Sequence, residues 1–134
     1  YVLSHGQKRR LSVACMVVGV PDVVVLDEPT FGQDYAQAKN LVQLLRQLAD
    51  KGASVVFITH DMRLVAEYAD RAAVLCDGEI IFDGTPAKLF ASPEVLERSR
   101  LRPPSVYEFS GELLGESLLT TSVTCDRIRE VISG

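Results

Sequence analysis

Two short apolar segments that lead into acidic or histidine side chains constrain the fold of this chain most strongly. Residues Val23–Leu26 and Ser54–Thr59 are dominated by β-branched and other apolar side chains. Such runs, apolar on both faces, predict buried strands of a parallel sheet. A helix is expected between them, because leucines recur at helical spacing from a cap at Asp34 to Gly52. This order predicts a right-handed parallel crossover and an α/β fold.

The other segments are expected to be helical apart from one hairpin. A first helix is predicted over residues 4–19 and a short helix around residues 64–68. Two strand-like runs between residues 72 and 83 flank Asp77-Gly78, a dipeptide typical of tight hairpin turns. The chain is therefore expected to alternate helices and strands before a helical end.

The composition indicates one globular, soluble folding unit. In 134 residues, 47% are hydrophobic and 24% are charged, which excludes a disordered chain. Fourteen Lys and Arg against eighteen Asp and Glu give a net charge of −4, which argues against a nucleic-acid partner. The longest apolar runs, Val13–Val18 and Val23–Leu26, are far shorter than the roughly 18 residues of a membrane span. Three scattered cysteines fit neither a zinc site nor a disulfide framework, and indicate a reducing cytoplasm.

Three parts of the sequence carry candidate chemistry. Residues Ser4–Gln7 offer a hydroxyl and close backbone approach at a helix N-terminus, which favours phosphate, although an ordinary capped helix has the same spacing. Asp27 and Glu28 follow a strand at the sheet edge where ligands collect, unless they are merely a solvated acid pair. His60 ends the next strand, so the sheet should place it beside Glu28, either for chemistry or as a structural residue. Asp34 fits a helix N-cap nearly as well as a ligand contact.

These features also stand in a fixed order along the chain. The order is Leu3–Gln7, Val23–Glu28, Asp34 and His60. In type, order and approximate spacing they resemble the signature loop, Walker B strand, D-loop and switch histidine of the ATPase subunit of an ABC transporter. The chain is therefore expected to be part of an ATP hydrolase.

The resemblance implies a division of the chain into two parts. Residues 1–90 would be the C-terminal part of the ABC ATPase domain, a partial P-loop NTPase fold with parallel strands, crossover helices and a β-hairpin. Residues 91–134 would be a small helical tail, with helices starting near Ser105 and Thr124.

The resemblance also implies which residues contact the nucleotide. Ser4, His5, Gly6 and Gln7 would contact the γ-phosphate of ATP bound by a second ATPase domain. His5 stands where the family usually has glycine, which adds a side chain near the phosphate. Asp34 would make a D-loop contact across the dimer.

The catalytic roles implied by the resemblance fall on three residues. Asp27 would help to hold Mg²⁺ through water, and Glu28 would polarise the attacking water as the general base. His60 would meet the γ-phosphate and help to hold that water.

Finer details are similar to the ATPases of energy-coupling-factor importers, which take up vitamins, cobalt or nickel. These details are Gln7–Leu11, Thr30–Asp34 and Leu101–Pro104. The similarity implies a second ATPase domain and integral membrane transporter subunits as partners. It also implies a peripheral location on the cytoplasmic face of the cell membrane.

One expected motif does not occur in the sequence. It has no Gly-x-x-x-x-Gly-Lys-Ser/Thr, the loop that cradles the β- and γ-phosphates, and its first residue is Tyr1. We therefore expect a C-terminal piece of a longer ATPase, inactive by itself. The alternatives are a soluble ABC-type ATPase outside transport and a non-catalytic remnant or regulatory module.

Overall fold

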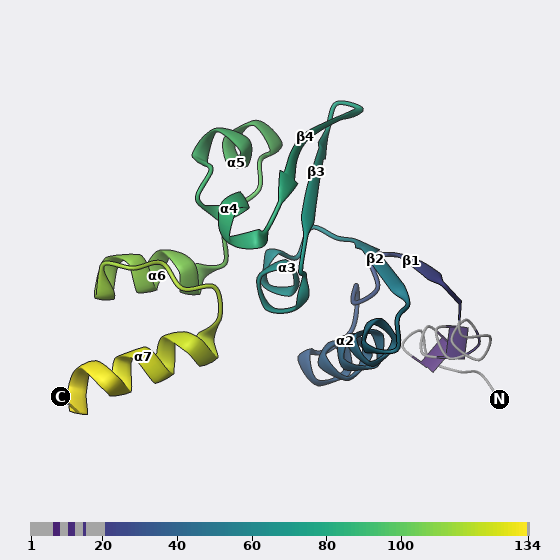
Figure 1. The fold of residues 1–134 in the computed structure, drawn as a ribbon, viewed down its shortest axis with the longest axis horizontal. Coiled ribbons are helices and arrows are strands. Elements are labelled where there is room, and N and C mark those ends of the chain that lie inside the picture. The colour runs from purple at the N-terminus through teal and green to yellow at the C-terminus, as the bar shows by residue number, and fades with distance from the viewer. Residues whose placement is uncertain (1–6, 9–10, 13–14, 16–20, 134) are drawn as a thin grey trace. The chain divides into compact units, whose positions relative to one another are not determined.

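The computed structural model describes residues 7–8, 11–12, 15 and 21–133 (Figure 1). The chain forms two compact units that divide between His60 and Asp61, where its length had predicted one folding unit. The boundary near residue 90 is a different expectation, because it marks where the resemblance to the ATPase family ends, and it stays a prediction. The first predicted helix is described only at Gln7, Lys8, Leu11, Ser12 and Cys15, all of which are helical, and its predicted ends lie outside the described residues.

The first unit contains the predicted strand, helix and strand. Strand β1 (Val23–Asp27), helix α2 (Tyr35–Asp50) and strand β2 (Ser54–Ile58) follow one another along the chain (Figure 1). The two strands pair in parallel, with Val24 opposite Val55 and Asp27 opposite Ile58. The parallel pairing predicted from the sequence is therefore confirmed.

Helix α2 buries one face of this sheet. Its leucine stripe packs against the inward side chains of β1, because leucines at helical spacing lie on one face. The buried residues of this core are Val24, Leu26, Leu41, Leu45 and Leu48.

The prediction that both strands are buried on both faces is wrong. Val24 is 3% exposed, whereas its neighbour Val25 is 59% exposed. We call the outward set Val23, Val25, Val56 and Ile58 the open face, since all four are exposed. Successive strand residues point to opposite sides, and α2 covers only one of them. Within the described part of the chain, β1 also pairs with β2 alone.

The second unit begins with helix α3 (Met62–Tyr68) and the predicted hairpin, strands β3 (Ala72–Cys76) and β4 (Glu79–Gly84). The strands pair antiparallel, and the turn residues Asp77 and Gly78 have φ of 50° and 83°. Positive φ at both central positions is the geometry that Asp-Gly favours in two-residue hairpins. The hairpin prediction is confirmed.

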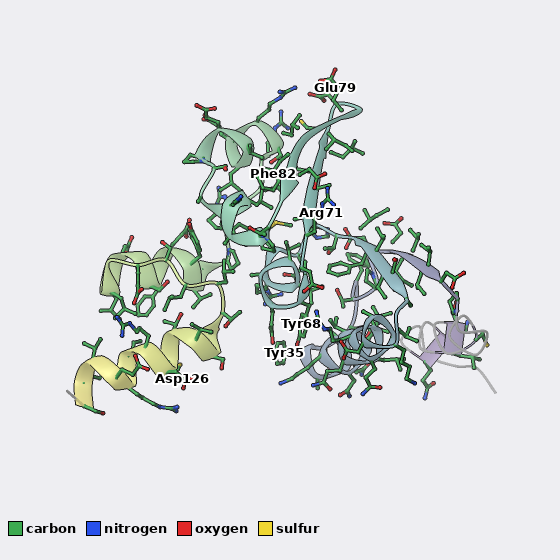
Figure 2. The ribbon with its side chains drawn as sticks, viewed as in Figure 1. Tyr35, Tyr68, Arg71, Glu79, Phe82 and Asp126 are labelled. Carbon is green, nitrogen blue, oxygen red and sulfur yellow. The ribbon has the colours of Figure 1, made fainter. Side chains whose placement is uncertain are left out.

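An ion pair joins the two ends of this hairpin. Arg71, labelled in Figure 2, donates from Nε to Oδ1 of Asp83 at 2.6 Å and from Nη2 to Oδ2 at 2.7 Å. Hydrogen bonding from Arg71 holds the pKa of the Asp83 carboxyl below its ordinary value. Both side chains are well exposed, so the pair adds little to stability.

Four helices complete the second unit. They are α4 (Pro86–Phe90), α5 (Pro93–Ser99), α6 (Ser105–Leu114) and α7 (Thr121–Ser133). The core of this unit contains Met62, Val65, Val74, Leu89, Phe90 and Leu96. The mixed α/β fold class predicted from the sequence is therefore confirmed.

The predicted start of the last helix is wrong by one turn. Helix α7 starts at Thr121, because the hydroxyl of Thr120 accepts a hydrogen bond from the N–H of Val123 and caps the helix there. Thr124 lies inside the helix, and its hydroxyl donates to the carbonyl of Thr120 at 3.0 Å.

Within residues 7–8, 11–12, 15 and 21–133, no helix has both the length and the apolar character needed to cross a membrane.

The first prediction compares substitutions of Val24, which is buried under α2, and of its neighbour Val25, which lies on the open face. In the 134-residue chain, Val24→Thr should lower the free energy of unfolding by about 1–3 kcal/mol, since it buries a hydroxyl among apolar side chains. Val25→Thr places the same hydroxyl on the open face and should change the free energy of unfolding by less than about 0.5 kcal/mol. Urea unfolding followed by circular dichroism measures both. Equal losses would show that the two valines are buried alike.

Helix α3 is capped by Asp61, whose Oδ1 accepts the backbone N–H of Arg63 at 3.0 Å. The Arg63 guanidinium also donates to both carboxylate oxygens, at 3.1 and 3.0 Å. Burial opposes ionisation of Asp61, but these hydrogen bonds from Arg63 outweigh it, so the pKa of Asp61 lies below its ordinary 3.8. The cap is therefore strongest where the carboxyl is ionised.

The second prediction concerns this cap. Asp61→Ala should lower the free energy of unfolding by about 1 kcal/mol near neutral pH. A lowered folded-state pKa gives stability that is present above 3.8 and is lost as the pH falls through the folded-state value. The difference between wild type and Asp61→Ala should therefore shrink on acidification in urea titrations. Asp61→Asn is the control, because it keeps a capping oxygen without the charge. A loss that is the same at every pH would contradict the prediction.

Candidate functional site

Glu28 lies directly after β1 and is held by backbone contacts on both sides. Its N–H donates to the carbonyl of Ile58 at 2.8 Å, and its carbonyl accepts from the N–H of Phe31 at 3.2 Å. Its φ is 43°, in the left-handed region that is strained for a side chain other than glycine. Pro29, whose side chain is fully buried, follows. The chain thus turns sharply at the carboxyl end of β1 and keeps Glu28 at the end of β2.

The Glu28 carboxylate lies against the two residues that follow β2. Oε1 accepts the backbone N–H of His60 at 3.2 Å and lies 2.6 Å from its ring Nδ1. Oε2 accepts the hydroxyl of Thr59 at 3.3 Å. The His60 side chain is 73% exposed and that of Glu28 is 32% exposed. The structure therefore brings Glu28 and His60 together as the parallel strands predict, and leaves the imidazole accessible.

The loop that follows Glu28 is held by hydrogen bonds of its own. The carbonyl of Thr30 accepts the N–H of Gln33 at 3.1 Å, and the Gln33 side chain donates from Nε2 to the carbonyl of Pro29 at 3.0 Å. Gln33 Oε1 is buried and has no hydrogen-bond partner among the described residues. These bonds fix the loop between Glu28 and α2.

Asp34 is the N-cap of α2. Its Oδ1 accepts the N–H of Gln37 at 2.8 Å, and its Oδ2 accepts from Gln37 Nε2 at 2.6 Å. The capping role predicted from the spacing is confirmed. The Asp34 side chain is exposed, so its role as a cap does not exclude a further contact with another molecule.

Comparison with known proteins relates these residues to one family. Residues 1–31, which include β1 and Glu28, match the ABC transporter family. An ABC transporter ATP-binding protein, so named, from Bacillus cereus is 47% identical over 112 residues, which cover 81% of this chain and 20% of the relative. A similarly named protein from Streptococcus pneumoniae is 40% identical over 111 residues, covering 83% of this chain and 20% of the relative.

The comparisons support an ABC transporter ATP-binding domain. A further relative, from Bacillus subtilis, is named HMP/thiamine import ATP-binding protein YkoD and is 42% identical over 125 residues, 90% of this chain and 23% of the relative. The chain spans about a fifth of the length of the curated relatives that it matches. Parallel β1 and β2 with the antiparallel hairpin fit part of the fold of an ABC ATPase.

The signature loop expected in an ABC transporter ATP-binding domain is only partly described. Ser4, His5 and Gly6 lie outside the described residues. Gln7 is helical and exposed. The predicted phosphate contacts of these four residues stay predictions.

Asp27 ends β1 and its side chain is exposed on the strand. Within the described ranges, no group of three or more His, Cys, Asp or Glu residues could hold a metal ion. Mg²⁺ at nucleotide sites is held by one or two carboxylates together with substrate phosphates, so a complete protein cage is not required. A single exposed carboxylate at the strand end fits such a shared site, and the role of Asp27 as a ligand stays a prediction.

Sequence reasoning missed two residues of this candidate site. The sequence predicts Thr59 only as the end of the second strand, yet its hydroxyl contacts the Glu28 carboxylate. Its position between a strand and His60 is the signal that could have found it. Gln33 stands in the segment that resembles the importer ATPases, but nothing in the spacing predicts that its side chain folds back onto Pro29.

Proposed function

We propose that this chain is the C-terminal part of the ATP-hydrolysing domain of an ABC-type importer. The observation that carries the proposal is the contact between Glu28 Oε1 and His60 Nδ1 at 2.6 Å, where two parallel strands end. A carboxylate and an imidazole at the carboxyl edge of an α/β sheet are suited to activating water beside a bound phosphate. The names of the relatives support ATP as the nucleotide.

In this proposal Glu28 is the general base. Its carboxylate accepts a proton from the water that attacks the γ-phosphate, and Oε1 becomes available when the His60 ring turns away from it. The His60 side chain is mostly exposed, which leaves solvent-filled space into which the ring would turn. Mg²⁺, held in part by Asp27, would neutralise charge on the phosphates.

The phosphate-binding loop that completes the site around Glu28 would come from outside this sequence. In return, the signature residues of this chain would complete the site of a second ATPase domain, and Asp34 would contact that domain. These signature residues are Ser4, His5, Gly6 and Gln7. Integral membrane transporter subunits would be further partners, and the domain would then lie on the cytoplasmic face of the membrane. Similarity to energy-coupling-factor ATPases and the thiamine-related name of one relative support a vitamin or metal ion as the cargo.

The third prediction concerns the 134-residue chain by itself. It should bind no Mg-ATP at micromolar concentration and should hydrolyse none, because its sequence has no loop to cradle the β- and γ-phosphates. Titration calorimetry and phosphate release measure the two properties. Micromolar binding with hydrolysis above the blank would refute the split site.

The fourth prediction concerns Glu28 in the full-length protein that contains this chain. Glu28→Gln should lower the rate of ATP hydrolysis by about 10²–10⁴-fold while ATP binding persists, since the amide keeps the shape but cannot accept the proton. ATP should then accumulate in a closed dimer, detected by size-exclusion chromatography with nucleotide analysis. Hydrolysis near the parental rate would show that Glu28 is not the base.

Ser4→Arg is the matched comparison for that variant. A bulky side chain in the signature should block closure of the dimer while ATP still binds at the phosphate-binding loop of the same subunit. If Ser4 only capped a helix, its loss would cost about 1 kcal/mol of stability and dimer formation would persist. Measuring turnover and dimer formation for both variants separates these roles.

A further inference from the structure

Three consecutive residues at the end of β2 contact Glu28. The carbonyl of Ile58 and the N–H of His60 are backbone groups, which any sequence would supply at these positions. The hydroxyl of Thr59 is different, because it depends on the side chain. It lies on the carboxylate oxygen that His60 does not contact, so the two oxygens of Glu28 have separate partners.

We propose that Thr59 is a positioning residue for the Glu28 carboxylate. The inference rests on the proposed function, in which Glu28 is the general base. His60 contacts Oε1 and Thr59 contacts Oε2, at 2.6 Å from Nδ1 and 3.3 Å from Oγ1 respectively. When the His60 ring leaves Oε1, the Thr59 hydroxyl and the His60 N–H still hold both ends of the carboxylate.

Rotation of the carboxylate is the motion that this hydroxyl limits. The terminal torsion of a glutamate side chain is broad, so a carboxylate that is anchored through one oxygen turns easily. An anchor on the second oxygen fixes the plane of the group. Thr59 suits this task because it is partly buried and β-branched, which restricts its own side-chain torsion.

The orientation of the carboxylate matters because the base must meet a water in line with the phosphate. Small errors of position at a reacting group lower the rate strongly even when binding is unchanged. The Thr59 bond, at 3.3 Å, is longer than the usual 2.7–2.8 Å of a hydroxyl bond, so its expected contribution is moderate. Loss of the hydroxyl should therefore affect turnover and leave ATP affinity unchanged.

The test compares Thr59→Val and Thr59→Ser in the full-length protein that contains this chain. Valine has the shape of threonine without the hydroxyl, and should lower kcat by about tenfold with KM for ATP changed by less than about twofold. Serine keeps the hydroxyl and should restore most of the lost kcat. Melting temperatures of both variants should match the parent, as expected if the hydroxyl affects turnover and not folding.

A second background separates this inference from the proposed function. In a Glu28→Gln protein, Thr59→Val should cause no further loss of turnover, because the base that it positions is already absent. If Glu28→Gln itself retained hydrolysis, the proposed function would fail. If Glu28→Gln were inactive but Thr59→Val turned over like the parent, only the role of Thr59 would be overturned. Equal losses for valine and serine, a raised KM or an unfolded valine variant would also overturn it.

Discussion

The parallel pairing of β1 and β2 is the constraint on which the candidate site depends. Its register places Asp27 opposite Ile58, so the residues that follow each strand emerge at the same edge of the sheet. Glu28 and His60 are 32 positions apart in the chain, yet they come within hydrogen-bond distance through this register. A shift of one residue would move each side chain to the opposite face and separate them. The register is fixed in turn by the burial of alternate strand residues under α2.

Strain at Glu28 is balanced by the groups around it. A left-handed φ at glutamate costs on the order of 1–3 kcal/mol and persists only where neighbouring contacts determine it. Here the backbone is held by Ile58 and Phe31, and the carboxylate by Thr59 and His60. Such concentration of strain and hydrogen bonds at one side chain is typical of positions that carry chemistry.

The sequence predicted the elements whose causes are local. Asp77-Gly78 predicted the hairpin because its turn geometry is a property of two residues, and the spacing of Asp34 and Gln37 predicted the cap of α2. Burial of both sheet faces was predicted wrongly, because an apolar strand does not reveal which elements will cover it. The position of Glu28 beside His60 could be predicted from two strand ends, whereas the Thr59 contact depends on a side-chain direction that spacing does not specify.

The loop between Glu28 and Asp34 links the strained carboxylate to the helix that holds the sheet. Gln33 joins the two ends of this link, since its side chain donates to the carbonyl of Pro29 while its backbone precedes the cap of α2. Because α2 also buries the leucine core against β1, the same helix supports the sheet from one side and the turn at Glu28 from its N-terminus. Weakening that helix would therefore disturb the carboxylate, although its hydrogen-bond partners Thr59 and His60 both lie outside α2.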